Sequence, residues 1–172
     1  DCPAIDADFQ RAAEALTEIA SLLAALPETR DINPLRHLLR AIRRQANAVR
    51  RQAWNSQTFA YNRLSRNGRD EAARVLLSRG QQLQARLAQL VKPVALFWLN
   101  APEDQVRALL QDPELFELAY LIRHDRRLQD QALSLESEQL IEGLAVDGLQ
   151  AWGDLYDSLV ARLRPVVEGE PM

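Results

Sequence analysis

Apolar residues recur at steps of three and four along most of the chain, which is the spacing of one face of an α-helix. The pattern is strictest over more than three heptads, at Leu35, Leu39, Ile42, Ala46, Val49, Ala53, Ser56 and Ala60. The same rhythm resumes at Leu76, Gly80, Leu83, Leu87, Leu90, Val94 and Phe97. Two heptad-patterned helices joined by a tight turn predict a long antiparallel coiled-coil hairpin over about residues 35–99.

The ends of the two long helices carry their own signals. Asn67 and Gly68 both tolerate the left-handed conformation used at helix ends, so we expect the first helix to stop there. Asn33 is the expected cap of its start, with Pro34 in the first turn. Pro93 interrupts the second helix and predicts a kink. Before the hairpin, an apolar stripe from Phe9 to Leu26 predicts one more helix.

Shorter helices are predicted after the hairpin. APEDQVRALL carries Pro102 in its first turn. Asp112 and Pro113 form a similar start, for a helix that we expect to run to about Leu133. These signals predict a subdomain of small helices over about residues 102–164.

The last two helices of this subdomain also have recognisable ends. Ser134 or Ser137 is the expected cap of ESEQLIEGLA. Asp147 and Gly148 separate that helix from LQAWGDLYDSLVARL, which Pro165 ends. Because no tandem repeat or low-complexity linker interrupts these segments, we predict one helical domain.

The tail RPVVEGEPM differs from the helical segments. Its two valines and its Glu-Gly pair predict a strand that reaches a turn. An isolated strand is not stable, so we expect its partner strand beyond residue 172. The predicted organisation is therefore an all-α domain over residues 1–164, followed by the beginning of a strand at 165–172.

The composition of the chain excludes several classes of protein and indicates its cellular compartment. The 172 residues are 47% hydrophobic and 26% charged, which argues against wholesale disorder. The net charge of −3 argues against a general nucleic-acid binder, and no apolar run reaches the roughly 20 residues that cross a bilayer. The single cysteine, Cys2, allows no internal disulfide, so the reducing cytoplasm is the expected compartment.

The sequence carries no recognisable catalytic or metal-binding motif. His37 and His124 are its two histidines, and no His-Glu-x-x-His pair brings two imidazoles to one helix face. Cys2 lies at a terminus, and no Gly-x-Ser-x-Gly elbow occurs. We therefore predict no catalytic, cofactor-binding or metal-binding residue in this chain.

Six arginines gather on one side of the first long helix, within an arc of roughly 120° at 100° per residue. They are Arg36, Arg40, Arg43, Arg44, Arg50 and Arg51, and together we call them the arginine stripe. One interpretation is a surface that meets nucleic acid, acidic lipid or the acidic face of another domain. The other is a solvated helix face that uses arginine as a good helix former. The acidic net charge of the chain favours the second.

Aromatic residues near the end of the chain follow a helical spacing. Trp152 and Tyr156 lie one turn apart and share a face with Leu149 and Leu159. The interleaved basic residues of a nucleic-acid stacking surface are missing. The spacing therefore predicts core packing and not ligand contact.

Residues 118–159 read LAYLIRHDRRLQDQALSLESEQLIEGLAVDGLQAWGDLYDSL. This run resembles the amino-terminal region of oligoendopeptidase F-type enzymes, relatives of thimet oligopeptidase. The matching residues are Arg123, His124, Arg126, Arg127, Leu133, Ser134, Glu136, Glu138, Gly148, Ala151, Trp152, Leu155, Tyr156 and Asp157. The resemblance is strongest over about residues 115–172. Ile122 departs from it, because the family often has an aromatic residue before the Arg-His pair.

The resemblance implies a cytoplasmic zinc metallopeptidase that cleaves short peptides inside a deep channel. The zinc ligands and the general-base glutamate of that family lie far downstream, and none of them maps onto this chain. The resemblance thus implies a non-catalytic amino-terminal domain that forms a wall or lid of the channel and binds no zinc itself. The implied partners are a catalytic domain of the same polypeptide and an oligopeptide substrate, with no nucleic acid and no membrane.

A free-standing helical interaction module is the alternative, in which the arginine stripe binds a protein or nucleic acid. The natural reading frame distinguishes the two hypotheses. A frame that continues for several hundred residues to a His-Glu-x-x-His helix supports the peptidase domain.

Overall fold

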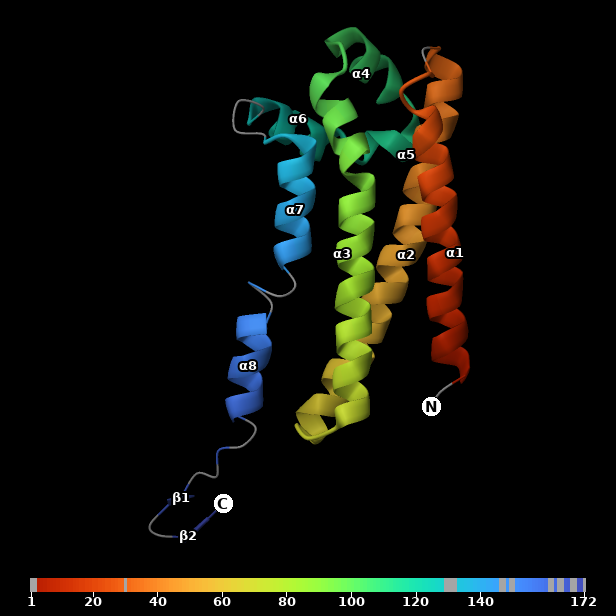
Figure 1. Ribbon diagram of the computed structural model, residues 1–172. Coiled ribbons are helices and arrows are strands. Elements are labelled where there is room, and N and C mark those ends of the chain that lie inside the picture. The colour runs from red at the N-terminus through yellow and green to blue at the C-terminus, as the bar shows by residue number, and fades with distance from the viewer. Residues whose placement is uncertain are drawn as a thin grey trace.

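The computed structural model describes residues 3–29, 31–128, 133–145, 148, 151–160, 163, 166–167 and 170–171. Its helices are α1 (Pro3–Ala25), α2 (Ile32–Arg66), α3 (Glu71–Asn100), α4 (Glu103–Leu109), α5 (Pro113–Phe116), α6 (Ala119–Arg127), α7 (Leu135–Ala145) and α8 (Ala151–Val160). The strands β1 (Val166–Val167) and β2 (Glu170–Pro171) follow. The long helices α1, α2 and α3 lie side by side, and α4, α5 and α6 gather across one end of them (Figure 1). The fold is all-α, as the sequence predicts.

The helices α2 and α3 form the predicted hairpin, and α2 buries the predicted heptad positions. Its buried residues are Leu35, Leu39, Ile42, Ala46, Val49, Ala53, Ser56 and Ala60. The two helices approach closely at Gly80, where a Cβ atom would lie 2.8 Å from Gln57 Cγ and 3.3 Å from the Ala53 carbonyl oxygen. The missing side chain at Gly80 therefore sets the spacing of the hairpin. Coiled-coil supercoiling stays a prediction.

The turn between α2 and α3 stops the first helix in a way that the sequence does not predict. Asn67 has φ −145° and ψ 93°, which is extended and not left-handed. Its side-chain oxygen instead accepts a hydrogen bond from the Arg69 N–H at 3.1 Å, as in an Asx turn. Asp70 then caps α3 by accepting the Ala73 N–H at 3.0 Å. The stop predicted at Asn67 and Gly68 is confirmed, since α2 ends at Arg66, but Asn67 caps it in an extended conformation.

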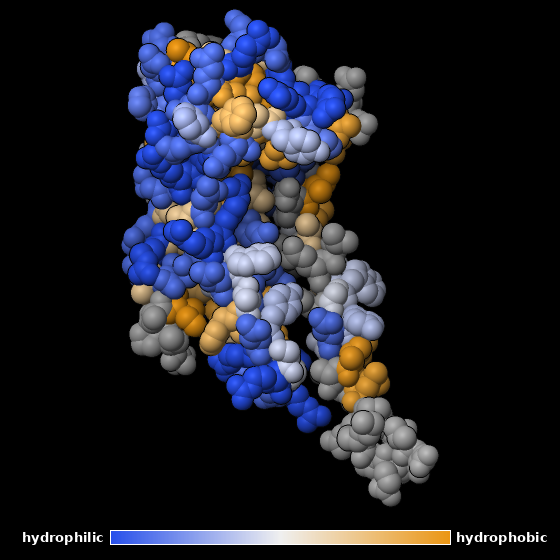
Figure 2. Space-filling view, turned by 180° about the vertical axis from the view of Figure 1, so that it is seen from behind, coloured by the Kyte–Doolittle hydropathy of each residue, from blue (hydrophilic) through white to orange (hydrophobic). Residues whose placement is uncertain are grey.

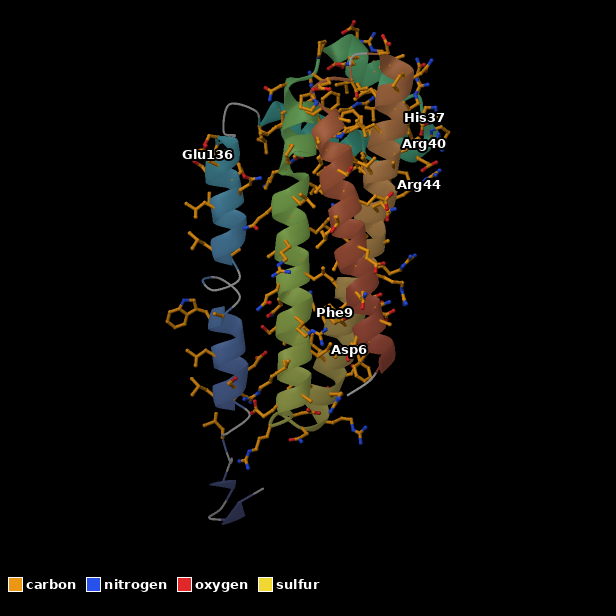
Figure 3. All side chains as sticks on the ribbon, turned by 45° about the vertical axis from the view of Figure 1, so that its right-hand side comes forward. Asp6, Phe9, His37, Arg40, Arg44 and Glu136 are labelled. Atoms are coloured by element: carbon orange, nitrogen blue, oxygen red, sulfur yellow. The ribbon has the colours of Figure 1, made fainter. Side chains whose placement is uncertain are left out.

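The helix α1 packs along the hairpin and completes a first apolar core. The buried residues of this core are Ala12, Ile19, Ile42, Ala46, Val49, Ala53, Leu83 and Leu87. Near the start of α1, Asp6 accepts a hydrogen bond from Arg79 of α3 at 2.9 Å. The Arg79 guanidinium also lies 4.2 Å from the centroid of the Phe9 ring. Figure 3 shows Asp6 and Phe9 near the start of α1. This ion pair and cation–π contact hold the start of α1 against α3.

A second apolar core lies where α3 meets the small helices. Leu109 and Leu115 are fully buried in it, and Trp98 is almost fully buried. The Phe97 ring meets the Trp98 ring edge-on, with 5.4 Å between centroids. The hairpin therefore docks on the small helices just after Pro93. The helix itself continues through Pro93 to its end, and the kink stays a prediction.

The start of α2 differs from the prediction by two residues. Asp31 is the cap, with an extended φ of −73° and ψ of 137°, and the helix begins at Ile32. Asn33 lies inside the first turn, where its side-chain oxygen accepts a hydrogen bond from Arg36 at 3.1 Å. The prediction of Asn33 as the cap is wrong because its side chain bonds forward to the next turn.

The prediction of one helix from Asp112 to about Leu133 is wrong, because two shorter helices form there. The segment forms α5 and α6, because the Leu118 N–H bonds to the Leu115 carbonyl at 2.9 Å in a tighter i→i+3 turn. With this turn between them, α5 and α6 both contribute buried residues to the second core, among them Leu115 and Ile122.

The helix α7 begins as predicted. The Oγ of Ser134 accepts the Ser137 N–H at 3.3 Å, which confirms Ser134 as the cap of α7. The break predicted at Asp147 and the stop predicted at Pro165 lie outside the described residues. Among the described residues, no helix is both long enough and apolar enough to span a bilayer.

The tail contains the predicted strand. β1 pairs with β2 in antiparallel fashion, with Val166 opposite Pro171 and Val167 opposite Glu170. Glu170–Pro171 returns alongside Val166–Val167, and a further partner strand beyond residue 172 stays a prediction.

Candidate functional site

One half of the arginine stripe contacts the start of α5. Arg40 donates to Asp112 at 3.3 Å and forms an ion pair with Glu114. The Nε of Arg44 donates to Glu114 at 2.8 Å. Figure 3 shows Arg40 and Arg44 on one side of α2, beside α5. Asp112 is also the cap of α5, because its side chain accepts the Glu114 N–H at 3.0 Å. An acidic helix start thus meets two of the arginines.

Two further arginines of the stripe also bond within the chain. Arg43 forms an ion pair with Glu117. Arg36 donates to the Ala108 carbonyl at 3.2 Å, although its Nε is buried without a hydrogen-bond partner among the described residues. These contacts tie α2 to α4 and α5, and a partner-facing role for this half of the stripe stays a prediction.

The Glu114 carboxylate is the most perturbed acid of this cluster. Its hydrogen bond with Arg44, with Arg40 close by, lowers its pKa from 4.5 to about 2. A carboxylate with a lowered folded-state pKa stabilises the fold above its unfolded pKa. The contribution is lost as the pH falls towards the folded-state value.

Acid titration should therefore reveal this cluster. We expect the free energy of unfolding to fall less steeply from pH 5 to pH 2 in Glu114→Gln than in the unchanged protein, because the variant has no carboxylate to protonate. Urea denaturation at each pH measures this slope. Glu28→Gln, which changes an exposed carboxylate, is the control and should keep the original slope. Equal slopes in both variants would contradict the pairing of Glu114 with the stripe.

The other half of the stripe is different. Arg50 donates to the Asn47 side-chain oxygen at 3.1 Å, and no carboxylate of the described residues pairs with it. Although much of Arg50 reaches solvent, surrounding protein atoms and then the charge of Arg43 lower its pKa. Arg51 is exposed. An anion-facing role for Arg50 and Arg51 stays a prediction.

Arg126 has a structural role that the sequence does not indicate. It donates from one guanidinium nitrogen to the carbonyl oxygens of Trp98, Leu99 and Ala101, at 2.7, 3.1 and 2.9 Å. These carbonyls lie at the carboxy-terminal end of α3, where the helix dipole is negative. Its other terminal nitrogen lies 3.4 Å from Glu103. Arg126 thus joins α6 to the end of α3.

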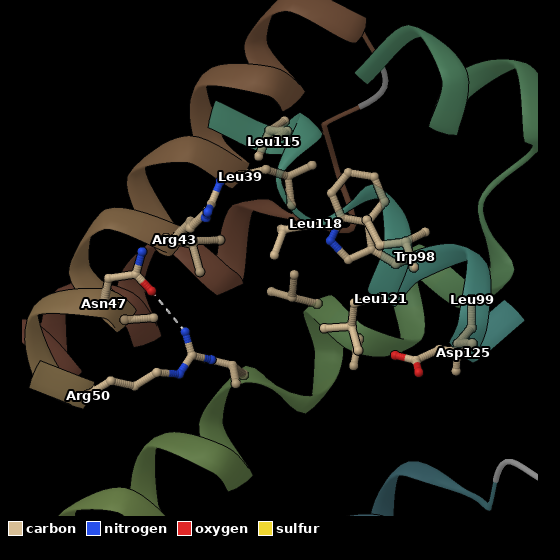
Figure 4. Close-up of a pocket in the computed structure, with 16 residues that line it drawn as sticks. Leu39, Arg43, Asn47, Arg50, Trp98, Leu99, Leu115, Leu118, Leu121 and Asp125 are labelled. Atoms are coloured by element: carbon tan, nitrogen blue, oxygen red, sulfur yellow. Dashed lines mark hydrogen bonds between the residues drawn. The ribbon is translucent and has the colours of Figure 1, made fainter. Parts of the chain in front are cut away.

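A pocket of about 230 Å³ opens between α2, α3 and α6 (Figure 4). Most of its wall is apolar and comes from Leu39, Ile42, Val91, Val94, Trp98, Leu118, Leu121 and Ile122. Arg43, Asn47 and Arg50 line it from α2, and Asp125 lines it from α6. It is a cavity in the helical domain with two arginines at one side.

The histidines do not form a metal site. His37 lies on α2 and is exposed, whereas His124 lies on α6, 3.3 Å from Asp125 and stacked on Tyr120. Within the described ranges, no group of three or more His, Cys, Asp or Glu side chains is placed to hold a metal ion. The donor set of a zinc centre is therefore absent from the part of the chain that the structure describes.

The helix α7 contacts α3 through polar groups. Gln89 and Gln139 each donate from the side-chain amide to the other residue's carbonyl oxygen, both at 3.2 Å. Lys92 donates to Glu138 at 3.1 Å, and Gly143 lies so close that a Cβ there would meet the Gln89 amide nitrogen at 2.5 Å. The polar side of α7 therefore faces the hairpin.

Large apolar residues cover the opposite side of α7 and continue onto α8. Their exposed fractions are Leu140 62%, Ile141 52%, Leu144 58%, Trp152 73%, Leu155 49%, Tyr156 67%, Leu159 55% and Val160 45%. We call this set the α7–α8 apolar face. Figure 2 shows apolar side chains as separate orange areas along both helices. A soluble domain rarely exposes so extended a row of large apolar side chains.

The prediction of core packing for Trp152 and Tyr156 is wrong within this chain. Both side chains, and Leu159 with them, are exposed, while Leu149 lies outside the described residues. The helical spacing correctly places them on one face, but no described element covers that face.

Comparison with known proteins finds a match to a family model over part of the chain. Residues 98–164 match a protein-family model described as Oligopeptidase F, for the amino-terminal region of M3 peptidases. The matched segment runs from the end of α3 through α8, and it includes Arg126 and the α7–α8 apolar face. No curated protein and no solved structure matches the chain.

Proposed function

With residues 98–164 identified as the amino-terminal domain of an oligoendopeptidase F-type peptidase, we propose that the chain forms one wall of the peptide channel of a zinc-dependent oligopeptidase. The complete enzyme hydrolyses short peptides, and its zinc and general base belong to a catalytic domain of the same polypeptide. In this proposal the chain forms part of the channel wall and contributes no catalytic residue. We place the enzyme in the cytoplasm, because a single cysteine allows no internal disulfide.

The orientation of α7 is the observation that carries this proposal. An amphipathic helix on a self-contained domain turns its apolar side towards the core. Here Gln139, Glu138 and Gly143 face α3 instead, and Leu140, Ile141 and the neighbouring apolar residues face away. We infer that the catalytic domain covers the α7–α8 apolar face.

A wall built in this way is suited to an enzyme that cleaves short peptides. The long hairpin is held by two apolar cores and by the contacts of Arg40, Arg44 and Arg126, which favours a rigid structure. A metal enclosed between such a wall and a second domain is reached by an oligopeptide, whereas a folded protein is too large to enter. Enclosure would thus limit the substrates.

Substitutions on the apolar face test the proposal. In the complete polypeptide, Leu144→Ser should lower the free energy of unfolding by about 1–2 kcal/mol and reduce peptidase activity, because it removes an apolar contact with the covering domain. In the 172-residue chain alone the same change should cost only about 0.5 kcal/mol, since the side chain is already 58% exposed. Calorimetry and a fluorogenic peptide assay measure both effects.

Val75→Ser is the matched control for this experiment. Val75 is 60% exposed on α3, so its replacement should have a small effect in both proteins. If Leu144→Ser and Val75→Ser behave alike in the complete polypeptide, the α7–α8 apolar face is not covered by another domain, and the proposal fails.

The alternative, a free-standing interaction module, has less support from the arginine stripe. Arg36, Arg40, Arg43 and Arg44 bond within the chain, which makes them less available for an external partner. The stripe thus contributes chiefly to the joint between α2 and the small helices.

A further inference from the structure

The pocket between α2, α3 and α6 has a continuous apolar wall that is open on one side. Val94 and Trp98 contribute to it from α3, and Ile42 contributes from α2. Leu121 of α6 also lines it and is 54% exposed. Arg50 of α2 and Ala95 of α3 are exposed lining residues too, so the pocket opens to solvent between the three helices. The volume of about 230 Å³ is below the roughly 300–1,000 Å³ of clefts that hold drug-sized ligands. The pocket therefore suits a ligand with one small apolar group.

Arg50 supplies a cation at this wall, and within the part of the chain that the structure describes no carboxylate pairs with it. The other stripe members beside it differ, because Arg43 pairs with Glu117 and Arg44 pairs with Glu114. Arg50 bonds only a neutral amide oxygen of Asn47 among the described residues. Figure 4 shows the Arg50 side chain extending along the pocket from α2. Partial burial and a neighbouring cation both destabilise its charge, and a bound anion would reverse this effect.

The remaining charge in the pocket limits the ligand further. Asp125 lies across the pocket from Arg50, and its carboxylate points inward (Figure 4). A second acidic group on the ligand would be repelled there. The charges therefore favour a ligand that carries one carboxylate, placed at the α2 side.

We propose that this pocket binds a small apolar monocarboxylate, with the apolar group between Ile42, Val94 and Trp98 and the carboxylate paired with Arg50. A bidentate pair of guanidinium and carboxylate is the geometry that arginine favours. Two sources carry this chemistry, namely a short fatty acid and the free carboxy-terminal residue of an apolar peptide. The inference rests on the pocket alone and does not depend on the proposed function.

Titration of the 172-residue chain with four probes tests the proposal. Hexanoate represents the fatty acid and N-acetyl-leucine represents the peptide terminus, while hexanamide and N-acetyl-leucinamide are their neutral matches. We expect at least one carboxylate to give saturable changes in the NMR signal of the Trp98 indole N–H and to bind roughly tenfold more tightly than its amide. The carboxylate that binds more tightly identifies the source.

Two variants assign the binding to this pocket. Arg50→Gln should weaken the carboxylate roughly tenfold and remove its advantage over the amide. Arg51→Gln makes the same change of charge on the next residue, which does not line the pocket, and it should leave binding unchanged. Ala95→Phe should fold, because Ala95 is exposed, and should abolish binding of all four probes by filling the pocket.

Three results would overturn the proposal. They are no saturable binding of either carboxylate, equal affinities for the carboxylates and their amides, and equal effects of Arg50→Gln and Arg51→Gln. The third result would show that binding depends on the general charge of α2 and not on the pocket.

Discussion

Replacing Arg126 with alanine should lower the free energy of unfolding by about 2–3 kcal/mol, because a charged donor to three carbonyl oxygens is lost. The oxygens of Trp98, Leu99 and Ala101 have no further helical turn to satisfy them. The side chain is also largely covered, with 21% of it exposed, so water replaces the guanidinium poorly. Urea denaturation followed by circular dichroism measures the change.

Arg127 provides the matched control for Arg126. It is the next residue on α6, is exposed, and among the described residues it donates to the Arg123 carbonyl at 3.3 Å. Arg127→Ala should therefore change the free energy of unfolding by less than about 0.5 kcal/mol. Arg126→Lys should cost less than Arg126→Ala, because an ammonium keeps the charge but lacks the planar fork. Similar losses for Arg126→Ala and Arg127→Ala would show that Arg126 does not hold α3 to α6.

Leu109→Ala should have the largest effect on stability, about 2–5 kcal/mol. Leu109 is fully buried in the second core, so the change removes apolar contact and leaves a cavity. It sits among side chains from α2, α3, α5 and α6, and the four elements are unable to collapse together around the vacated space. Chemical denaturation gives the magnitude.

Leu140→Ala is the comparison for Leu109→Ala. The same atoms are removed at a position that is 62% exposed on α7, where no cavity forms. We expect a loss below about 0.5 kcal/mol in the 172-residue chain. A loss at Leu109 as small as that at Leu140 would mean that the small helices do not pack on the hairpin as described.

The heptad positions of α2 could be predicted from the sequence because they follow from local periodicity. Each helical turn presents the same side, so Leu35 and Ala60 fall on one line without knowledge of any other element. The prediction weakens in α3 after Pro93, where Trp98 is buried but Phe97 is only half-buried. There the contacts with the small helices determine which side chain is buried.

The contacts of the arginines could not be predicted in the same way. Arg40 meets Glu114 across 74 positions of sequence and Arg126 meets Trp98 across 28. No local spacing indicates such partners, because they depend on how the small helices fold back over the end of the hairpin. The Arg-rich run around Arg126 was visible as part of the family resemblance, but its bond to the end of α3 was not.

On α8 the sequence correctly predicts which aromatic residues share a face, but not whether that face is buried. Their spacing correctly groups Trp152 with Tyr156 on one side of a helix, and the sequence therefore predicts burial. Burial requires a covering element, and no described residue of this chain provides one. A pattern identifies the face that needs a partner, but it does not identify the partner.

We propose that this chain is the non-catalytic part of a peptidase. Hydrolysis of a fluorogenic peptide, with zinc supplied, should be compared between the complete polypeptide encoded by the gene and the 172-residue chain alone. We expect the complete polypeptide to cleave the peptide and the chain alone to be inactive. Cleavage by the chain alone, or no cleavage by the complete polypeptide, would contradict the account.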